Sequence, residues 1–336
     1  MAAGNRTTGS GEDRLIDRYF RPLARHPGAF GLIDDAATYT PPPGQDLVLT
    51  VDAIVAGVHF FSDDPPESIA RKALRVNLSD LAAKGAAPAG FLLTMALPKT
   101  TDEVWLADFA QGLAADIAAF GCPLFGGDTV STPGPATISV TAFGRLPEGT
   151  AVRRRGAKPG DSIVVSGAIG DAVLGLALRG RDADAKGWPL DDDERLFLID
   201  RYLRPRPRLE LAETIRLSAS AAMDVSDGLA GDLAKLCAAS GVDAVVDLAA
   251  VPLSVAARVV LSAHPALIER LITGGDDYEI LATVSPDNFA ALQEAGEAAG
   301  VPVTRIGEVK EGTGQALFLD PDGKVLDLAQ TSFSHF

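Results

Sequence analysis

The chain has few cysteines: Cys122 and Cys237 are the only two among its 336 residues. Two cysteines cannot build the disulfide framework that stabilises many small secreted domains. The first residues, Met1 to Arg14, are polar and lack the apolar stretch of a signal peptide. We therefore expect a reduced, cytoplasmic compartment for this chain.

Basic residues are also scarce, since 30 Lys and Arg stand against 45 Asp and Glu, for a formal net charge of −15. The densest group of positive charge is Arg153 to Arg155. A nucleic-acid-binding protein needs a basic face to meet the phosphates, so we expect no nucleic-acid partner. An acidic protein that handles nucleotides must neutralise their phosphates with metal ions.

Long hydrophobic runs are missing. The apolar segment from Val242 to Leu261 is interrupted by Asp243, Asp247, Pro252 and Arg258. A membrane-spanning helix needs about 20 consecutive, mostly apolar residues. We therefore expect a soluble protein with no membrane partner.

Several catalytic motifs are absent as well. The sequence has no G-x-x-x-x-G-K-[ST] loop, no H-R-D followed by D-F-G, no G-x-G-x-x-G after an expected strand and no G-x-S-x-G. No Cys and His pairing is evident, so covalent catalysis has no candidate nucleophile. These absences argue against Walker-A enzymes, protein kinases, nicotinamide enzymes and serine hydrolases.

The pattern of apolar residues predicts an α/β (α+β) fold with two domains. Residues 1–11 are small and polar and are expected to be disordered, residues 12–148 form a first domain, and residues 149–336 form a second. Strands are predicted at 46–55, 88–97, 135–143, 162–166, 244–248, 281–284 and 316–319, and helices at 12–23, 68–84, 102–120, 171–178, 209–218 and 229–239. Residues 181–194 are interpreted as a mobile acidic insertion, followed by a Pro-rich hinge at 204–208.

What the sequence does contain is a set of aspartates, each after an apolar run and beside Gly, Ser or another Asp. They lie in Gly31-Leu-Ile-Asp34-Asp35, Thr50-Val51-Asp52, Asn77-Leu-Ser-Asp80, Gly126-Gly127-Asp128, Asp224-Val-Ser226-Asp227-Gly228 and Gly274-Gly275-Asp276-Asp277. Carboxylates on glycine-rich turns bind hard cations, and Mg²⁺ commonly shares its oxygen ligands with substrate phosphates. The set predicts a site for several metal ions and phosphates, assembled from both halves of the chain.

Each of these residues also has a simpler interpretation. Adjacent side chains on a strand point to opposite faces, so one carboxylate of Asp34 and Asp35 enters a site while the other bonds to backbone. Gly126 and Gly127 make either an ordinary tight turn or a close backbone approach to phosphate. His59, among apolar residues, is more often a hydrogen-bonded core residue than a ligand.

The segment from Asp224 to Leu229 gives the strongest local signal. Strand alternation sends Asp224 and Ser226 to one side, while Asp227 opens the next helix as its N-cap. Capping explains Asp227 fully and leaves Asp224 unexplained.

In this order the motifs resemble those of the thiamine-monophosphate kinase family, within the aminoimidazole-ribotide-synthetase-like ATP-binding superfamily. The resemblance covers about residues 12–336. Its specific pieces are Thr50-Val-Asp52, Val55-Ala-Gly-Val-His59-Phe60, Lys72-Ala-Leu-Arg-Val-Asn77-Leu-Ser-Asp80-Leu-Ala-Ala-Lys-Gly85, Gly126-Gly-Asp128-Thr129, Arg155-Gly-Ala-Lys-Pro-Gly160-Asp161, Asp224-Val-Ser-Asp227-Gly228-Leu229 and Gly274-Gly-Asp-Asp-Tyr278-Glu279.

The resemblance implies two α/β domains and a homodimer in which the mixed sheets of the first domains pair through their strands. It implies ATP-dependent phosphorylation of thiamine monophosphate to thiamine diphosphate, with ATP as co-substrate and several Mg²⁺ ions. The family's metal positions correspond to Asp35, Thr50, Val51 (main chain), Asp52, Asp80, Asp128, Asp224 and Asp227. Its ATP contacts correspond to Phe120, Gly127, Asp128, Arg154 and Ser226, and its substrate contacts to His59, Asp276 and Phe333.

Two residues depart from the family pattern. Ile33 stands where a Gly usually precedes the Asp34-Asp35 pair, and Phe333 lacks the hydroxyl of the commoner Tyr. Phe333 can stack on a thiamine ring but cannot donate a hydrogen bond.

A phosphate oxygen is already deprotonated near neutral pH, so we expect direct in-line transfer with no general base and no nucleophilic residue. Two alternatives remain open. One is another ATP-using enzyme of the same superfamily, and the other is a non-catalytic Mg-ATP-binding regulatory protein.

Overall fold

A computed structural model describes residues 14–332. The expected disorder of residues 1–11 and the predicted substrate contact Phe333 lie outside the described residues. The chain divides into two compact units. Unit 1 comprises the described part of Met1–Pro42 with Leu49–Leu74 and Pro88–Phe143, and unit 2 comprises Pro43–Val48, Arg75–Ala87 and the described part of Gly144–Phe336.

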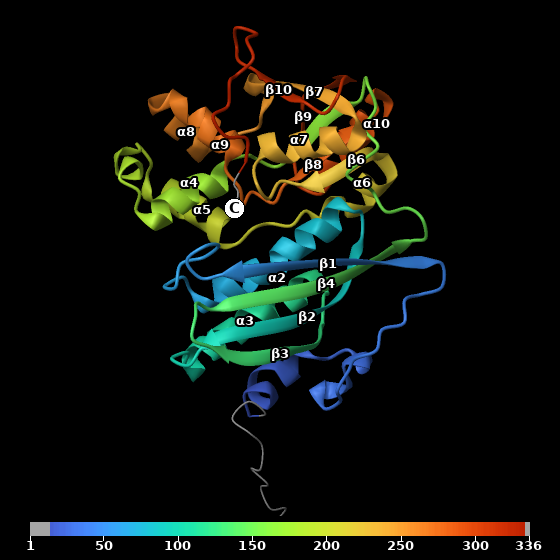
Figure 1. Cartoon of the computed structure of the whole chain (residues 1–336), viewed down its shortest axis with the longest axis vertical. Helices are drawn as coiled ribbons and strands as arrows, with labels where there is room; N and C mark the ends of the chain where they lie inside the picture. The colour runs from blue at the N-terminus through green and yellow to red at the C-terminus, as the bar shows by residue number, and fades with distance from the viewer. Residues whose placement is uncertain (1–13, 333–336) are drawn as a thin grey trace, which may run out of the picture. The chain divides into compact units, whose positions relative to one another are not determined.

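Unit 1 contains most of a four-stranded sheet with the strand order β1-β4-β2-β3. Its strands are β1 (Gln45–Val55), β2 (Ala87–Pro98), β3 (Leu124–Thr132) and β4 (Thr137–Pro147). One face of this sheet is covered by α3 (Glu103–Phe120) and the first part of α2 (Pro66–Ala83) (Figure 1). Alternation decides which side chains reach that core: Phe91, Leu93 and Met95 are buried, while Leu92 is 41% exposed.

Three sequence interpretations in this unit were wrong in detail. The segment at 88–97, largely apolar and therefore expected to be a buried strand, is a strand, but Leu92 on one of its faces is 41% exposed. Gly126, Gly127 and Asp128 form no turn and lie inside β3, which runs parallel to β2. The described part of the stretch 12–23, predicted as one helix, instead combines a π-helical segment η1 (Ile16–Phe20) with a 3₁₀ segment η2 (Arg21–Leu23), and a second 3₁₀ segment, η3 (Pro27–Leu32), follows.

Unit 2 is built on a six-stranded sheet with the order β10-β7-β9-β5-β8-β6. Its strands are β5 (Ser162–Ser166), β6 (Ala219–Asp224), β7 (Val242–Asp247), β8 (Ile280–Val284), β9 (Val303–Glu311) and β10 (Ala316–Leu319). Its helices are α4 (Asp171–Gly180), α5 (Asp192–Leu203), α6 (Ala212–Ser218), α7 (Leu229–Ser240), α8 (Val255–Ala263), α9 (Ile268–Thr273) and α10 (Pro286–Ala298), and its 3₁₀ segments are η4 (Asp184–Gly187), η5 (Leu209–Leu211), η6 (Leu248–Ala250) and η7 (Pro265–Leu267).

Apolar cores lie on both faces of this second sheet. Ile163 and Val165 of β5 pack with Leu233 of α7, whereas Val164 between them packs with Leu292 of α10 on the opposite face. A strand buried on both faces has a continuous apolar run, which in β5 is Ile163 to Val165 between the buried Ser162 and Ser166. The expected strand at 162–166 follows directly from this property.

The acidic segment 181–194 is packed against the rest of unit 2. Ala185, Trp188 and Leu190 are buried in a hydrophobic cluster with Leu174 and Leu198 of the flanking helices α4 and α5. The insertion therefore has three apolar anchors between its acidic residues, and its mobility stays a prediction. None of the helices in the described part of the chain is long and apolar enough to cross a membrane.

Candidate active site

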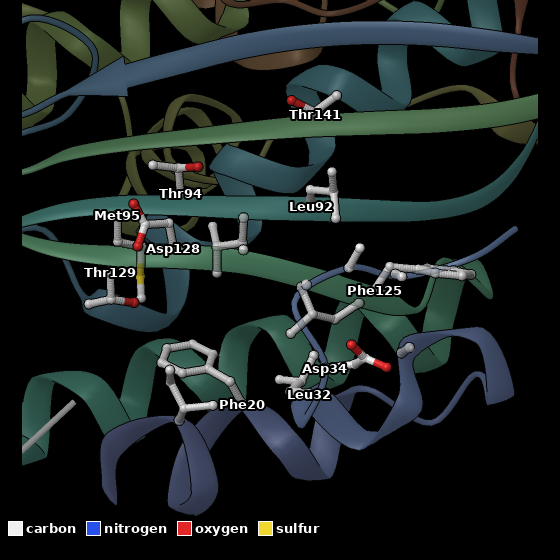
Figure 2. A pocket seen from close by; sticks show the side chains of 18 of the residues that line it. Phe20, Leu32, Asp34, Leu92, Thr94, Met95, Phe125, Asp128, Thr129 and Thr141 are labelled. Carbon is white, nitrogen blue, oxygen red and sulfur yellow. The ribbon is translucent and has the colours of Figure 1, made fainter. Parts of the chain in front are cut away.

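A pocket of about 660 Å³ lies in unit 1, between strands β2 and β3 and the N-terminal segments (Figure 2). Its apolar lining includes Phe20, Leu32, Leu92 and Phe125. Its polar lining comprises Asp34, Asp35, Thr94, Asp128, Thr129 and Thr141. The pocket therefore combines an apolar wall with carboxylates and hydroxyls, as is usual for a small-molecule site.

Asp34 and Asp35 both line this pocket, but they do not play the same part. Oδ1 of Asp34 accepts a hydrogen bond from the backbone N–H of Asp35 at 2.8 Å, which is the backbone role foreseen for one member of the pair. Ile33 has an ordinary φ of −112°, whereas Gly31 and Leu32 have φ values of 63° and 55°. The left-handed turn precedes Ile33, so the missing glycine at that position imposes no backbone strain.

Gly127 and Asp128 lie side by side in β3 on the rim of the same pocket. A Cβ on Gly127 would come within 1.8 Å of the carbonyl oxygen of Leu93 on β2. Glycine is required there because the neighbouring strand approaches closely. Asp128 pairs in register with Thr94, and Figure 2 places their side chains close together.

Five other predicted residues of unit 1 do not line the pocket: Thr50, Val51, Asp52, His59 and Phe120. Thr50, Val51 and Asp52 lie on β1, and β4 and β2 separate that strand from β3. Three strand spacings amount to roughly 14 Å. Phe120 is the last residue of α3. Within unit 1, the predicted metal ligands are thus divided between the two edges of one sheet.

His59 lies in the turn after β1 and is half-buried. Its Nδ1 accepts a hydrogen bond from the backbone N–H of Val55 at 3.1 Å, so the neutral ring carries its proton on Nε2. The buried Lys72 donates to the carbonyl oxygen of His59 at 2.9 Å. These bonds fix the ring and its backbone, which agrees with the structural interpretation and leaves the ligand role a prediction.

In unit 2, three predicted residues from three different motifs surround one lysine. Nζ of Lys84 donates to the carbonyl oxygen of Ala222 at 2.7 Å, two residues before Asp224 on β6. Burial lowers the pKa of Lys84, the nearby carboxylates of Asp224 and Asp80 oppose that effect, and Arg154 adds to it. Lys84 lies within the motif from Lys72 to Gly85, but the sequence analysis predicted no role for it.

Two loops of unit 2, residues 225–228 and 274–279, are joined by backbone hydrogen bonds. The N–H of Asp276 donates to the carbonyl oxygen of Ser226 at 2.9 Å, and the N–H of Tyr278 donates to Val225 at 2.8 Å. A Cβ on Gly275 would come within 2.3 Å of the carbonyl oxygen of Ser226, so glycine permits this approach. The predicted ATP contact Ser226 and the predicted substrate contact Asp276 therefore lie on one backbone platform.

The predicted N-cap role of Asp227 was wrong. Helix α7 has Gly228 at its N-cap and no side-chain cap hydrogen bond. Nζ of Lys235 instead binds Oδ2 of Asp227 at 2.5 Å and Oδ1 of Asp232 at 2.8 Å. Oδ2 of Asp232 accepts the backbone N–H groups of Ser226 and Asp227, both at 3.0 Å. Asp232, on the first turn of α7, therefore provides the hydrogen-bond acceptor for two backbone N–H groups of the preceding loop. The sequence analysis did not predict this role.

A buried charge network lies at the end of the loop that contains Asp276, and the sequence analysis did not predict it. The fully buried Glu279 accepts hydrogen bonds from Ser166 at 2.6 Å, from Arg201 at 2.9 Å and from Nε of Arg208 at 2.6 Å. Asp277 accepts the N–H groups of Gly170 and Ala172 at the start of α4. Burial of the Asp277 carboxyl raises its pKa well above the usual range. The only sequence signal was a pair of carboxylates directly before the apolar strand β8.

Among the described residues, no three His, Cys, Asp or Glu side chains converge to hold a metal ion. The donors nevertheless suit Mg²⁺ in kind, since Asp35 and Asp128 present oxygens to the pocket of unit 1 and Asp224 ends β6 in unit 2. Mg²⁺ usually binds through one or two carboxylates together with substrate phosphates and water. A preformed cage of three carboxylates is not required for such an ion.

Family models match both halves of the chain. The N-terminal domain of AIR synthase related proteins matches residues 33–146, and the C-terminal domain matches residues 158–320. Thiamine-monophosphate kinase of Caulobacter vibrioides is 46% identical over 308 residues, which cover 90% of this chain and 85% of the relative. The enzyme of Escherichia coli K12 is 41% identical over 334 residues, which cover 97% and 98%.

Solved structures agree with these relatives. Thiamine-monophosphate kinase from Stenotrophomonas maltophilia has a TM-score of 0.80 at 39% identity, covering 94% of this chain and 96% of that one. AaThiL complexed with AMPPCP and TMP has a TM-score of 0.76 at 31% identity, covering 92% and 97%. Hydrogenase maturation protein HypE, at 20% identity and a TM-score of 0.78, shares the fold. The chain therefore belongs to the thiamine-monophosphate kinase family and is a phosphotransferase.

Proposed function

We propose that this protein phosphorylates thiamine monophosphate to thiamine diphosphate, with ATP as the phosphoryl donor and Mg²⁺ as the required ion. The observation that carries the proposal is the joined pair of loops in unit 2. There the ATP contact Ser226, the metal ligand Asp227 and the substrate contact Asp276, all named from the family resemblance, are held by the 2.9 Å bond between Asp276 and Ser226. One backbone platform would then orient both substrates.

The chemistry requires little from the protein beyond orientation. A phosphate oxygen of thiamine monophosphate attacks the γ-phosphorus of ATP, the bond to the β,γ-bridging oxygen breaks, and ADP leaves with that electron pair. The attacking oxygen carries no proton near neutral pH, so no side chain has to act as a base. The absence of a His-centred catalytic pair in the sequence fits this mechanism.

The chain's own task is to bring several negative groups together. Asp35 and Asp128 in the pocket, with Asp224 and Asp80 in unit 2, would hold the ions, and Arg154 would contact ATP. Bound Mg²⁺ supplies the charge that offsets repulsion between the two phosphates. Arg is suited to its part because its planar guanidinium pairs with phosphate oxygens.

The function would be divided between the two halves of the chain. Residues 12–148 would form the ATP- and Mg²⁺-binding domain, through which the protein dimerises, and residues 149–336 the C-terminal domain. Support for a homodimer comes from β1, where Leu47, Leu49 and Val51 share one face and are 41%, 65% and 60% exposed. Apolar residues in a row on an edge strand are what a second copy can cover.

Replacing Leu49 by aspartate should convert a dimer to a monomer, since a charge would then have to be buried in the pairing face. Sedimentation velocity measures the change. Leu196→Asp, at an equally exposed leucine on α5, is the matched control and should sediment like the parent protein. A parent protein that is already monomeric at micromolar concentration would contradict the dimer.

The function itself is tested by a product assay with ATP and Mg²⁺, offering thiamine monophosphate or free thiamine as acceptor. Thiamine diphosphate and ADP should appear in equal amounts with the monophosphate, and free thiamine should give no product. Phosphorylation of free thiamine alone would overturn the substrate assignment. Binding of ATP with no product from either acceptor would favour a regulatory protein instead.

A further inference from the structure

Lys235 forms ion pairs with two carboxylates, one of which belongs to the predicted metal ligand Asp227. Its ammonium binds Oδ2 of Asp227 at 2.5 Å and Oδ1 of Asp232 at 2.8 Å. Partial burial lowers the pKa of Lys235, the hydrogen bonds to both carboxylates raise it, and the net direction is upward. A single positive charge here serves two negative ones.

The two carboxylates differ in their surroundings. The side chain of Asp232 is fully buried, and its Oδ2 is committed to the N–H groups of Ser226 and Asp227. Asp227 is 38% exposed and can exchange partners with solvent. A buried carboxylate without a cation is costly, so Lys235 has to stay with Asp232 while Asp227 is the partner that can leave.

We propose that Lys235 is a positioning residue. Its ammonium pairs with the carboxylate of Asp227 in the free protein and gives up that carboxylate to a divalent ion that arrives with ATP. The proposal rests on the proposed function, because it needs Asp227 to be a metal ligand. In the free protein, the ammonium keeps Asp227 close to the Ser226 platform. A bound ion would then take Asp227 as a ligand, and Lys235 would keep its bond to Asp232.

This exchange makes the resident ammonium a competitor of the metal. Lys235→Met keeps the apolar stem of the side chain and removes the charge, so it should bind Mn²⁺ about two- to fivefold more tightly, the range expected for losing one partly exposed ion pair. Lys235→Arg keeps the charge and should bind Mn²⁺ as the parent protein does. The measurement is a titration of Mn²⁺ by its free electron paramagnetic resonance signal, with the full-length protein and saturating AMPPCP.

Lys310→Met is the matched control, because it removes a lysine that pairs with Glu308 at 2.7 Å on β9, outside the two loops. It changes the net charge equally and should leave Mn²⁺ binding unchanged. If Lys235→Met fails to fold because Asp232 keeps an unpaired charge, the double variant Asp232→Asn/Lys235→Met removes both charges and should show the same tightening.

An unchanged or weaker Mn²⁺ affinity in the folded variants would overturn the competition and leave Lys235 as a structural clamp. A parent protein that binds no Mn²⁺ with AMPPCP would instead overturn the proposed function. The two failures are distinct, since only the second appears in the parent protein.

Discussion

Replacing Asp224 by alanine should lower turnover by roughly 10²- to 10³-fold, the loss expected when one group that stabilises a charged transition state is removed. Asp224 is 6% exposed at the end of β6, in a place where Lys84, Asp80 and Arg154 also gather. Under the proposed function, its carboxylate would hold an ion against the phosphates of the substrates. The measurement is the rate of thiamine diphosphate formation at saturating ATP and Mg²⁺.

Asp247 provides the control, since it also ends a strand of the same sheet, while its carboxylate accepts the N–H of Ala249 outside the two loops. Asp247→Asn should keep turnover close to that of the parent protein. Near-normal turnover of Asp224→Ala at saturating Mg²⁺ would contradict the role of Asp224 in metal binding. A circular dichroism spectrum matching that of the parent protein would separate lost chemistry from lost folding.

The sequence predicted the regular elements well where one physical rule dominated. The strand at 162–166 has an apolar centre, Ile163 to Val165, because both of its faces are buried. The helix at 102–120 begins after Asp102, whose side chain accepts the N–H of Trp105. The tight turn considered for Gly126 to Asp128 was wrong because glycines favour a turn locally, whereas the close approach of β2 explains Gly127 within a strand. The latter reason is tertiary, so no local pattern contains it.

The functional site divides in the same way. The Asp224 and Asp276 motifs were found because glycine and carboxylate fall together in short segments. The partners of Glu279 were not found, since Ser166, Arg201 and Arg208 precede it by 113, 78 and 71 residues. The pairing of Asp227 with Lys235 was missed for a different reason: capping was a sufficient local explanation for an aspartate before a helix.

Replacing Glu279 by glutamine should lower the free energy of unfolding by about 3 to 5 kcal/mol, as is usual when one partner of a buried ion pair is removed. Both guanidinium groups would lose their anion, and the new amide would turn a donor toward at least one of them. Glu279 also ends a loop in which Asp276 and Tyr278 have φ values of 74° and 50°. Such conformations cost non-glycine residues about 1 to 3 kcal/mol each, so the loop needs fixed anchors.

Urea denaturation measures the loss, and the apparent affinity for thiamine monophosphate should fall with it because Asp276 is released. Glu308→Gln breaks an exposed pair with Lys310 in the same unit, and it should leave both quantities almost unchanged because water already screens that pair. If Glu279→Gln were as stable as Glu308→Gln, the two arginines would find other anions in the fold. Asp277, the buried carboxylate two residues before Glu279, argues against that outcome, because its two oxygens already accept the N–H groups of Gly170 and Ala172.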